Sequence, residues 1–212
     1  MLKFFLLLCM TTSSFALTLE QVKSELSKTI FPKDSIEIRM ETLVEVPNVS
    51  TQSMKIYLVQ KGTSKIYMEL KSSLLNQRSI INGSRMKIID LKTKESQIVP
   101  YNGDALQELK PLENLNPLES GNWKEPKYVS ANLYSIVGDS TVLFYNSKKK
   151  RIEKAETKTS ESFVTTTFEY NADNSLKVML MEVNAGGVFS KITNTFSIFR
   201  HSKKFPDKLF EF

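Results

Sequence analysis

Residues 53–70 of this 212-residue chain read SMKIYLVQKGTSKIYMEL, and this stretch decides the fold class. Before the central Lys-Gly-Thr, Ile56 and Leu58 alternate with polar or aromatic neighbours. After it, Ile66 and Met68 alternate in the same way. A period of two on both sides of a glycine-containing turn is typical of an antiparallel β-hairpin. The stretch therefore predicts two paired strands that share one apolar face.

The same alternation recurs along most of the chain, interrupted by short turns. The dipeptide Asn82-Gly83 lies between two such arms and supplies the positive-φ positions of a type I′ turn. Strands are predicted at 35–41, 53–60, 64–70, 77–81, 85–90, 127–136, 141–146, 151–158, 162–170, 175–184 and 188–199. A further short strand at 97–99 is left open. About ten or eleven short strands joined by tight turns predict one antiparallel meander, as a large curved sheet or a barrel.

A different period marks the segment before the first strand. Leu19, Val22 and Leu26 recur on one face of a 3.6-residue period, and Thr18 opens a capping-box pattern. These features predict one amphipathic helix over residues 18–30. Because its apolar stripe needs a partner, we expect the helix to lie across the concave face of the sheet.

After Pro100 the alternation stops until the strand predicted at 127–136. Leucines recur every third residue from Leu106 to Leu118, while two prolines in this segment prevent a single long helix. Long connections in compact domains are often functional covers. Two interpretations stay open: a movable helical lid over the concave face, or an apolar plug at one end of the core.

The N-terminus has the order of a secretory signal peptide. Lys3 precedes a short apolar run, which is followed by polar residues and a small-x-small tripeptide ending at Ala16. We expect residues 1–16 to be removed and residues 17–212 to form a single domain. Cys9 lies in the removed part, so the mature chain contains no cysteine, which fits a periplasmic location.

Composition argues against most catalytic chemistry. The chain has one His and one Cys, too few for a Cys/His metal site or a Ser/His/Asp triad. It contains no glycine-rich phosphate-binding motif, and its net charge of +6 is spread along the chain. We therefore expect no enzyme activity, no metal or cofactor, and no nucleic-acid partner.

The order of elements resembles the LolA/LolB-like periplasmic lipoprotein carriers of the outer-membrane lipoprotein-sorting superfamily. The matching pieces are the helix at 18–30, the hairpin turning at Gly62, the segment 80–90 with its turn glycine and Asp90, and the aromatic tail at 210–212. The resemblance implies a mainly β fold with helices (α+β). The implied architecture is an incomplete antiparallel β-barrel with an N-terminal helix and a helical lid covering the concave face.

The resemblance also implies a function and partners. An apolar cavity would bind the acyl chains of lipoproteins or lipids, and the carrier would deliver them towards the outer membrane. An inner-membrane release complex and an outer-membrane acceptor are the implied partners. The alternative is a periplasmic sensor or interaction module of the same fold. The third-strand Pro and Arg of the better-known carriers are replaced by the stretch 67–70, YMEL, so no functional residue carries over from there.

One apolar face of each element forms the predicted cavity lining, although such a face is ordinarily just core. The predicted lining residues are Leu19, Val22, Leu26, Ile56, Leu58, Ile66, Met68, Leu106, Leu109, Leu112, Val178, Leu180, Ile192 and Phe196. Met179 and Met181 fall on the other face of their strand, so which side of that strand lines a cavity stays open.

Overall fold

The computed structural model describes residues 17–29, 35–62, 64–102, 117–119, 121–201 and 205–212. Its helices are α1 (Leu19–Thr29), η2 (Pro117–Glu119) and η3 (Asp207–Phe210). Its strands are β1 (Ser35–Glu45), β2 (Gln52–Lys61), β3 (Lys65–Ser72), β4 (Asn76–Asn82), β5 (Arg85–Asp90), β6 (Ser96–Pro100), β7 (Lys127–Ser130), β8 (Leu133–Val137), β9 (Thr141–Asn146), β10 (Arg151–Lys158), β11 (Ser162–Tyr170), β12 (Leu176–Ala185) and β13 (Val188–His201).

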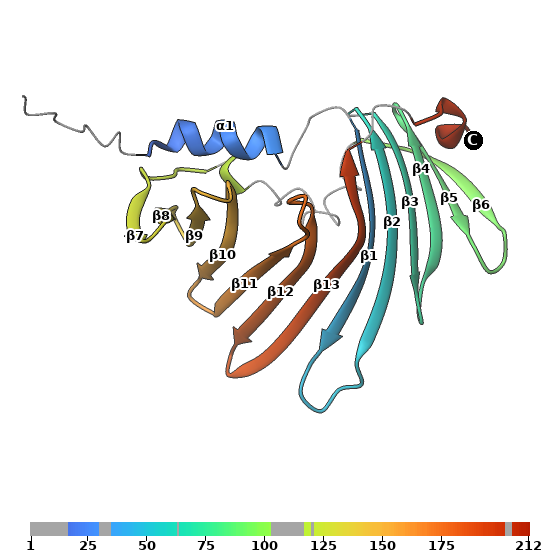
Figure 1. Cartoon of the computed structure of the whole chain (residues 1–212). Coiled ribbons are helices and arrows are strands. Elements are labelled where there is room, and N and C mark those ends of the chain that lie inside the picture. The colour runs from blue at the N-terminus through green and yellow to red at the C-terminus, as the bar shows by residue number, and fades with distance from the viewer. Residues whose placement is uncertain (1–16, 30–34, 63, 103–116, 120, 202–204) are drawn as a thin grey trace, which may run out of the picture.

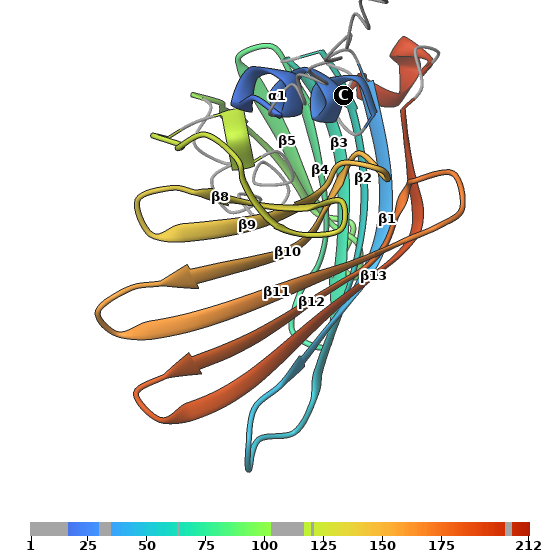
Figure 2. The same cartoon turned by 60° about the vertical axis from the view of Figure 1, so that its left-hand side comes forward.

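All thirteen strands belong to one antiparallel sheet in the order β6-β5-β4-β3-β2-β1-β13-β12-β11-β10-β9-β8-β7. The sheet is strongly curved and does not close, so β6 and β7 are its two edges (Figures 1 and 2). The predicted curved antiparallel sheet is confirmed. Strands that follow one another in sequence pair with each other, except β6 and β7, which form the two edges. At the centre, β1 pairs with β13 along ten residue pairs from Ile36–His201 to Glu45–Lys191.

The predicted count of ten or eleven strands is wrong. The stretch 127–136 is two strands, because the chain reverses at Asn132, whose φ of 63° lies in the left-handed region that Asn tolerates. The short segment left open at 97–99 is also a true strand, β6, paired with β5.

Helix α1 spans Leu19–Thr29 and packs against one face of the sheet, which we call the concave face. Its apolar stripe meets buried residues of the strands β8 to β10, such as Ile136 and Leu143. The helix therefore lies on this face of the sheet, as predicted, over the strands β8 to β10 (Figure 1). The predicted lid residues Leu106, Leu109 and Leu112 lie outside the described residues.

A C-terminal clip, residues 205–212, covers the part of the opposite, convex face that β2, β3 and β4 form. Phe210 is fully buried against Val59, Tyr67 and Ile80. The Asp207 carboxylate forms salt bridges with Lys61 Nζ at 3.0 Å and with Lys65 Nζ at 2.7 Å. The aromatic residues of the tail are evident in the sequence, whereas their docking onto the outer face of the sheet was not predicted.

Candidate functional site

The concave face of the central strands carries a continuous cluster of apolar side chains, which we call the concave cluster. Its buried members come from β1 to β4, β12 and β13: Ile38, Met40, Ile56, Leu58, Ile66, Ile81, Leu176, Met179 and Phe196. Partly buried residues including Met54, Met68, Met86, Phe168 and Met181 pack against it. Methionine and aromatic side chains make up much of this cluster, and the flexible thioether chains of methionine can adopt several packing arrangements.

The strand register explains why these residues gather. Directly opposed residues of neighbouring strands project to the same side of a sheet. Met40 is opposed to Ile56 in β2 and to Phe196 in β13. Leu58 is opposed to Met68 in the same way. The period of two in each strand therefore becomes one apolar surface across the sheet.

Helix α1 is held on the same face by polar contacts as well as by its apolar stripe. Tyr145 donates a hydrogen bond from its hydroxyl to Glu25 Oε2, and Lys150 Nζ lies 3.2 Å from Glu25 Oε1. Burial, and then this hydrogen bond to a carboxylate, raise the pKa of Tyr145 above its usual value. At the helix start, the backbone N–H of Leu19 donates to Glu125 Oε2 at 2.8 Å.

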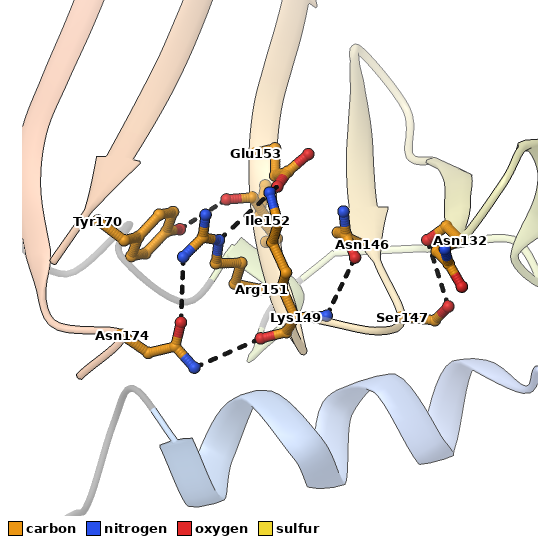
Figure 3. A network of polar contacts seen from close by, with 9 residues as sticks. All are labelled: Asn132, Asn146, Ser147, Lys149, Arg151, Ile152, Glu153, Tyr170 and Asn174. Atoms are coloured by element: carbon orange, nitrogen blue, oxygen red, sulfur yellow. Dashed lines mark hydrogen bonds and ion pairs between the residues drawn. The ribbon is translucent and has the colours of Figure 1, made fainter. Parts of the chain in front are cut away.

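A polar network ties the β9–β10 turn to the β11–β12 turn next to α1 (Figure 3). The Arg151 guanidinium lies over the Tyr170 ring, 4.4 Å from its centroid, and donates to Asn174 Oδ1 at 3.0 Å. Tyr170 in turn donates to the carbonyl of Ile152 at 2.6 Å. Burial raises the pKa of Tyr170, so the phenol stays protonated and keeps donating. The contacts make this end of the sheet a fixed support for the helix.

The convex face differs in character, because it bears a hollow of about 510 Å³ that is lined mostly by charged and polar residues. Arg39, Tyr57, Glu69 and Lys71 are among its lining residues. Burial alone would raise the pKa of the Glu69 carboxyl, but hydrogen bonds from Tyr67, Arg78 and Lys71 outweigh it and lower that pKa to about 2. Because Tyr67, Arg78 and Lys71 already pair with this carboxylate, we assign Glu69 to a structural ion-pair network and not to a ligand site.

The structure brings many of the predicted lining residues together. Ile56, Leu58, Ile66 and Phe196 belong to the concave cluster, and Met68 packs against it. Leu19, Val22 and Leu26 form the inner stripe of α1, and Ile192 shares the concave face because it is opposed to Met181. Whether any of them contacts a ligand stays a prediction.

Val178 and Leu180 are not brought to this face. Val178 is opposed to Thr195 and Leu180 to Thr193, on the convex side. Met179 and Met181 lie on the concave side of β12 instead. Residues 178–181, VMLM, are apolar on both sides, so alternation alone could not identify the inward face.

Within the described part of the chain, no helix is long and apolar enough to cross a membrane. No three His, Cys, Asp or Glu side chains among the same residues lie close enough to hold a metal ion.

Comparison with known proteins gives structural matches only. No protein-family model matches the sequence, and no curated protein matches it. A LolA superfamily protein from Nitrosomonas europaea superposes with a TM-score of 0.58 at 12% identity, over 92% of this chain and 98% of that one. A DUF1329 family protein from Desulfovibrio piger gives 0.54 at 10% identity, over 91% and 96%.

A third match is to a protein described as a lipoprotein-sorting domain. It is an outer membrane lipoprotein-sorting protein domain from Vibrio parahaemolyticus, with a TM-score of 0.51 at 11% identity, over 90% of this chain and 94% of that one. All three matches span nearly the whole of both chains. The protein therefore has the fold of the LolA-like lipoprotein-sorting proteins, as the resemblance in its sequence implied.

Proposed function

We propose that this protein is a periplasmic carrier that holds the acyl chains of lipoproteins or lipids against the concave cluster and delivers them towards the outer membrane. The observation that carries the proposal is the continuous apolar surface on the inner side of an unclosed sheet. Each CH₂ group withdrawn from water contributes about 0.8 kcal/mol, so one or two acyl chains supply ample affinity. Binding of this kind needs no catalytic residue and no cofactor.

The similarity of fold supports the same proposal, since two of the similar structures are a LolA superfamily protein and an outer membrane lipoprotein-sorting protein domain. The signal-peptide pattern ending at Ala16 supports the periplasm as the place of action. An inner-membrane complex that releases the cargo and an outer-membrane acceptor belong to this proposal as the partners of such a carrier.

A pair of variants on one strand tests the proposal. Met181 faces the concave cluster, whereas its neighbour Leu180 faces the convex side, and both are partly buried. Met181→Glu places a carboxylate where an acyl chain would lie, so we expect affinity for a fluorescent long-chain lipid to fall at least about tenfold, since an unpaired charge is costly in an apolar contact. Leu180→Glu is the matched control and should bind like the parent.

Mass spectrometry of organic extracts from the purified native protein identifies the cargo directly. Circular dichroism of both variants confirms that the sheet is intact. Equal binding by the Met181→Glu variant and the parent, or no binding of long-chain lipid by the parent, would contradict the proposed function.

A further inference from the structure

One polar pair lies in the middle of the apolar concave face. Asn194 of β13 is opposed to Thr42 of β1 on one side and to Met179 of β12 on the other. The exposed fractions are 5% for Asn194 and 6% for Thr42. The next residue of β13 on this face is Phe196, a member of the concave cluster. A carboxamide is therefore surrounded by the same apolar surface on which acyl chains are proposed to bind.

The hydrogen bonding of this pair leaves a donor free. The Thr42 hydroxyl donates to Asn194 Oδ1 at 2.7 Å, which occupies the amide oxygen and orients the amide group. The amide nitrogen carries two N–H groups. Among the described residues, Asn194 Nδ2 donates no hydrogen bond.

The free nitrogen is not fully occluded. In the part of the chain that the structure describes, Arg151 Nε is the one fully occluded side-chain nitrogen or oxygen without a hydrogen-bond partner. Asn194 Nδ2 is thus not fully occluded, although only 5% of the residue is exposed. A buried N–H that lacks an acceptor is costly, so this nitrogen is a place where an incoming oxygen atom is favoured.

We propose that Asn194 Nδ2 donates a hydrogen bond to the carbonyl oxygen of an acyl ester, with Thr42 as the residue that positions the amide. This inference rests on the proposed function. It names the chemical group of the cargo that Asn194 would recognise. The chains themselves lie on apolar side chains, which accept any hydrocarbon of suitable length. The ester carbonyl at the head of each chain can accept a hydrogen bond from the amide N–H. A site that hydrogen-bonds such a group discriminates against an analogue that lacks it.

The test compares ester lipids with their ether analogues, which have the same chains and headgroup but no carbonyl. Displacement of a fluorescent fatty-acid probe from mature protein, residues 17–212, measures both affinities. One arm uses a diacyl phosphatidylglycerol and its dialkyl ether. The other uses a synthetic diacylglyceryl-cysteine lipopeptide and its dialkyl ether. The arm with the larger ratio of ester affinity to ether affinity shows whether the ester belongs to a free lipid or to a lipidated protein.

We expect the parent protein to bind the ester form about two- to tenfold more tightly than the ether form, as one hydrogen bond provides. Asn194→Leu should reduce this ratio to about one while leaving ether binding in place. Thr42→Val should reduce the ratio in part. Thr166→Val is the matched control, because Thr166 lies on the same face opposite Met181 and does not contact the pair.

Melting temperatures of the three variants show whether each is folded. A parent protein without ester preference, or an Asn194→Leu variant that keeps the parental ratio, would overturn the inference while leaving the carrier function standing. Failure of the parent to bind either the ester or the ether would overturn the proposed function itself, and this inference with it.

Discussion

The docking of α1 onto the sheet should depend strongly on Leu26. Its side chain is fully buried in the cluster that joins the helix to β8, β9 and β10. Leu26→Ala removes three carbon atoms, which corresponds to about 2.4 kcal/mol of lost transfer free energy at about 0.8 kcal/mol each. The cavity that remains adds to this, so we expect the free energy of unfolding to fall by about 3 kcal/mol.

Guanidinium denaturation, followed by Trp123 fluorescence and far-UV circular dichroism, measures this loss. Trp123 packs against the same cluster and therefore reports on the helix. With a denaturant slope of about 4 kcal/mol/M, the midpoint should decrease by about 0.75 M. The control is Leu74→Ala, the same substitution at a turn residue that is 89% exposed, and it should change the free energy by less than about 0.5 kcal/mol. A loss below about 1 kcal/mol for Leu26→Ala, or equal losses for both variants, would refute the docking described here.

Three further predictions concern Trp123 and the C-terminal clip. Gly138→Ala places a Cβ about 2.8 Å from the Trp123 ring, so we expect a shifted emission maximum and a stability loss of about 1–3 kcal/mol; an unchanged spectrum would contradict this packing. Phe210→Ala should increase hydrogen–deuterium exchange across residues 205–212, because it empties a fully buried site, whereas Phe212→Ala, 38% exposed, should leave exchange nearly unchanged. Hydrogen bonds from Lys65 and Lys61 lower the pKa of Asp207 from 3.8 to about 2, so the stabilisation that Asp207 provides is complete above pH 4 and is lost as the pH falls towards 2. Asp207→Asn should remove this pH dependence of exchange in the clip, and a persistent dependence would point to another group.

Local patterns in the sequence predicted most of the sheet, because hairpins are encoded by neighbouring residues. The turns at Gly62 and Asn82-Gly83 show this, and both link adjacent strands of the structure as expected. The division at Asn132 was missed because the left-handed conformation of a single Asn leaves little trace in a run of alternating residues. The pairing of β1 with β13 was not predicted either, since nothing local links segments so far apart.

The candidate site was predicted less completely than the fold. The sequence indicated Ile56, Leu58 and Phe196, where one face of the strand is clearly more apolar than the other. It could not distinguish Met179 from Val178, because both faces of that strand are apolar. Asn194 carries no signal in the sequence, as its role depends on the surroundings that the register creates.

The central pairing of β1 with β13 has a consequence for how the chain folds. Each half of the sheet can form from hairpins between neighbours in sequence, but the two halves join only when Ile36 meets His201 and Glu45 meets Lys191. Closing so long a loop is entropically unfavourable and makes contact order high, which slows folding. Until it closes, β1 and β13 are two long unpaired edges, and such edges readily pair with other chains. The period of greatest risk of aggregation therefore comes after both halves have formed and before they meet.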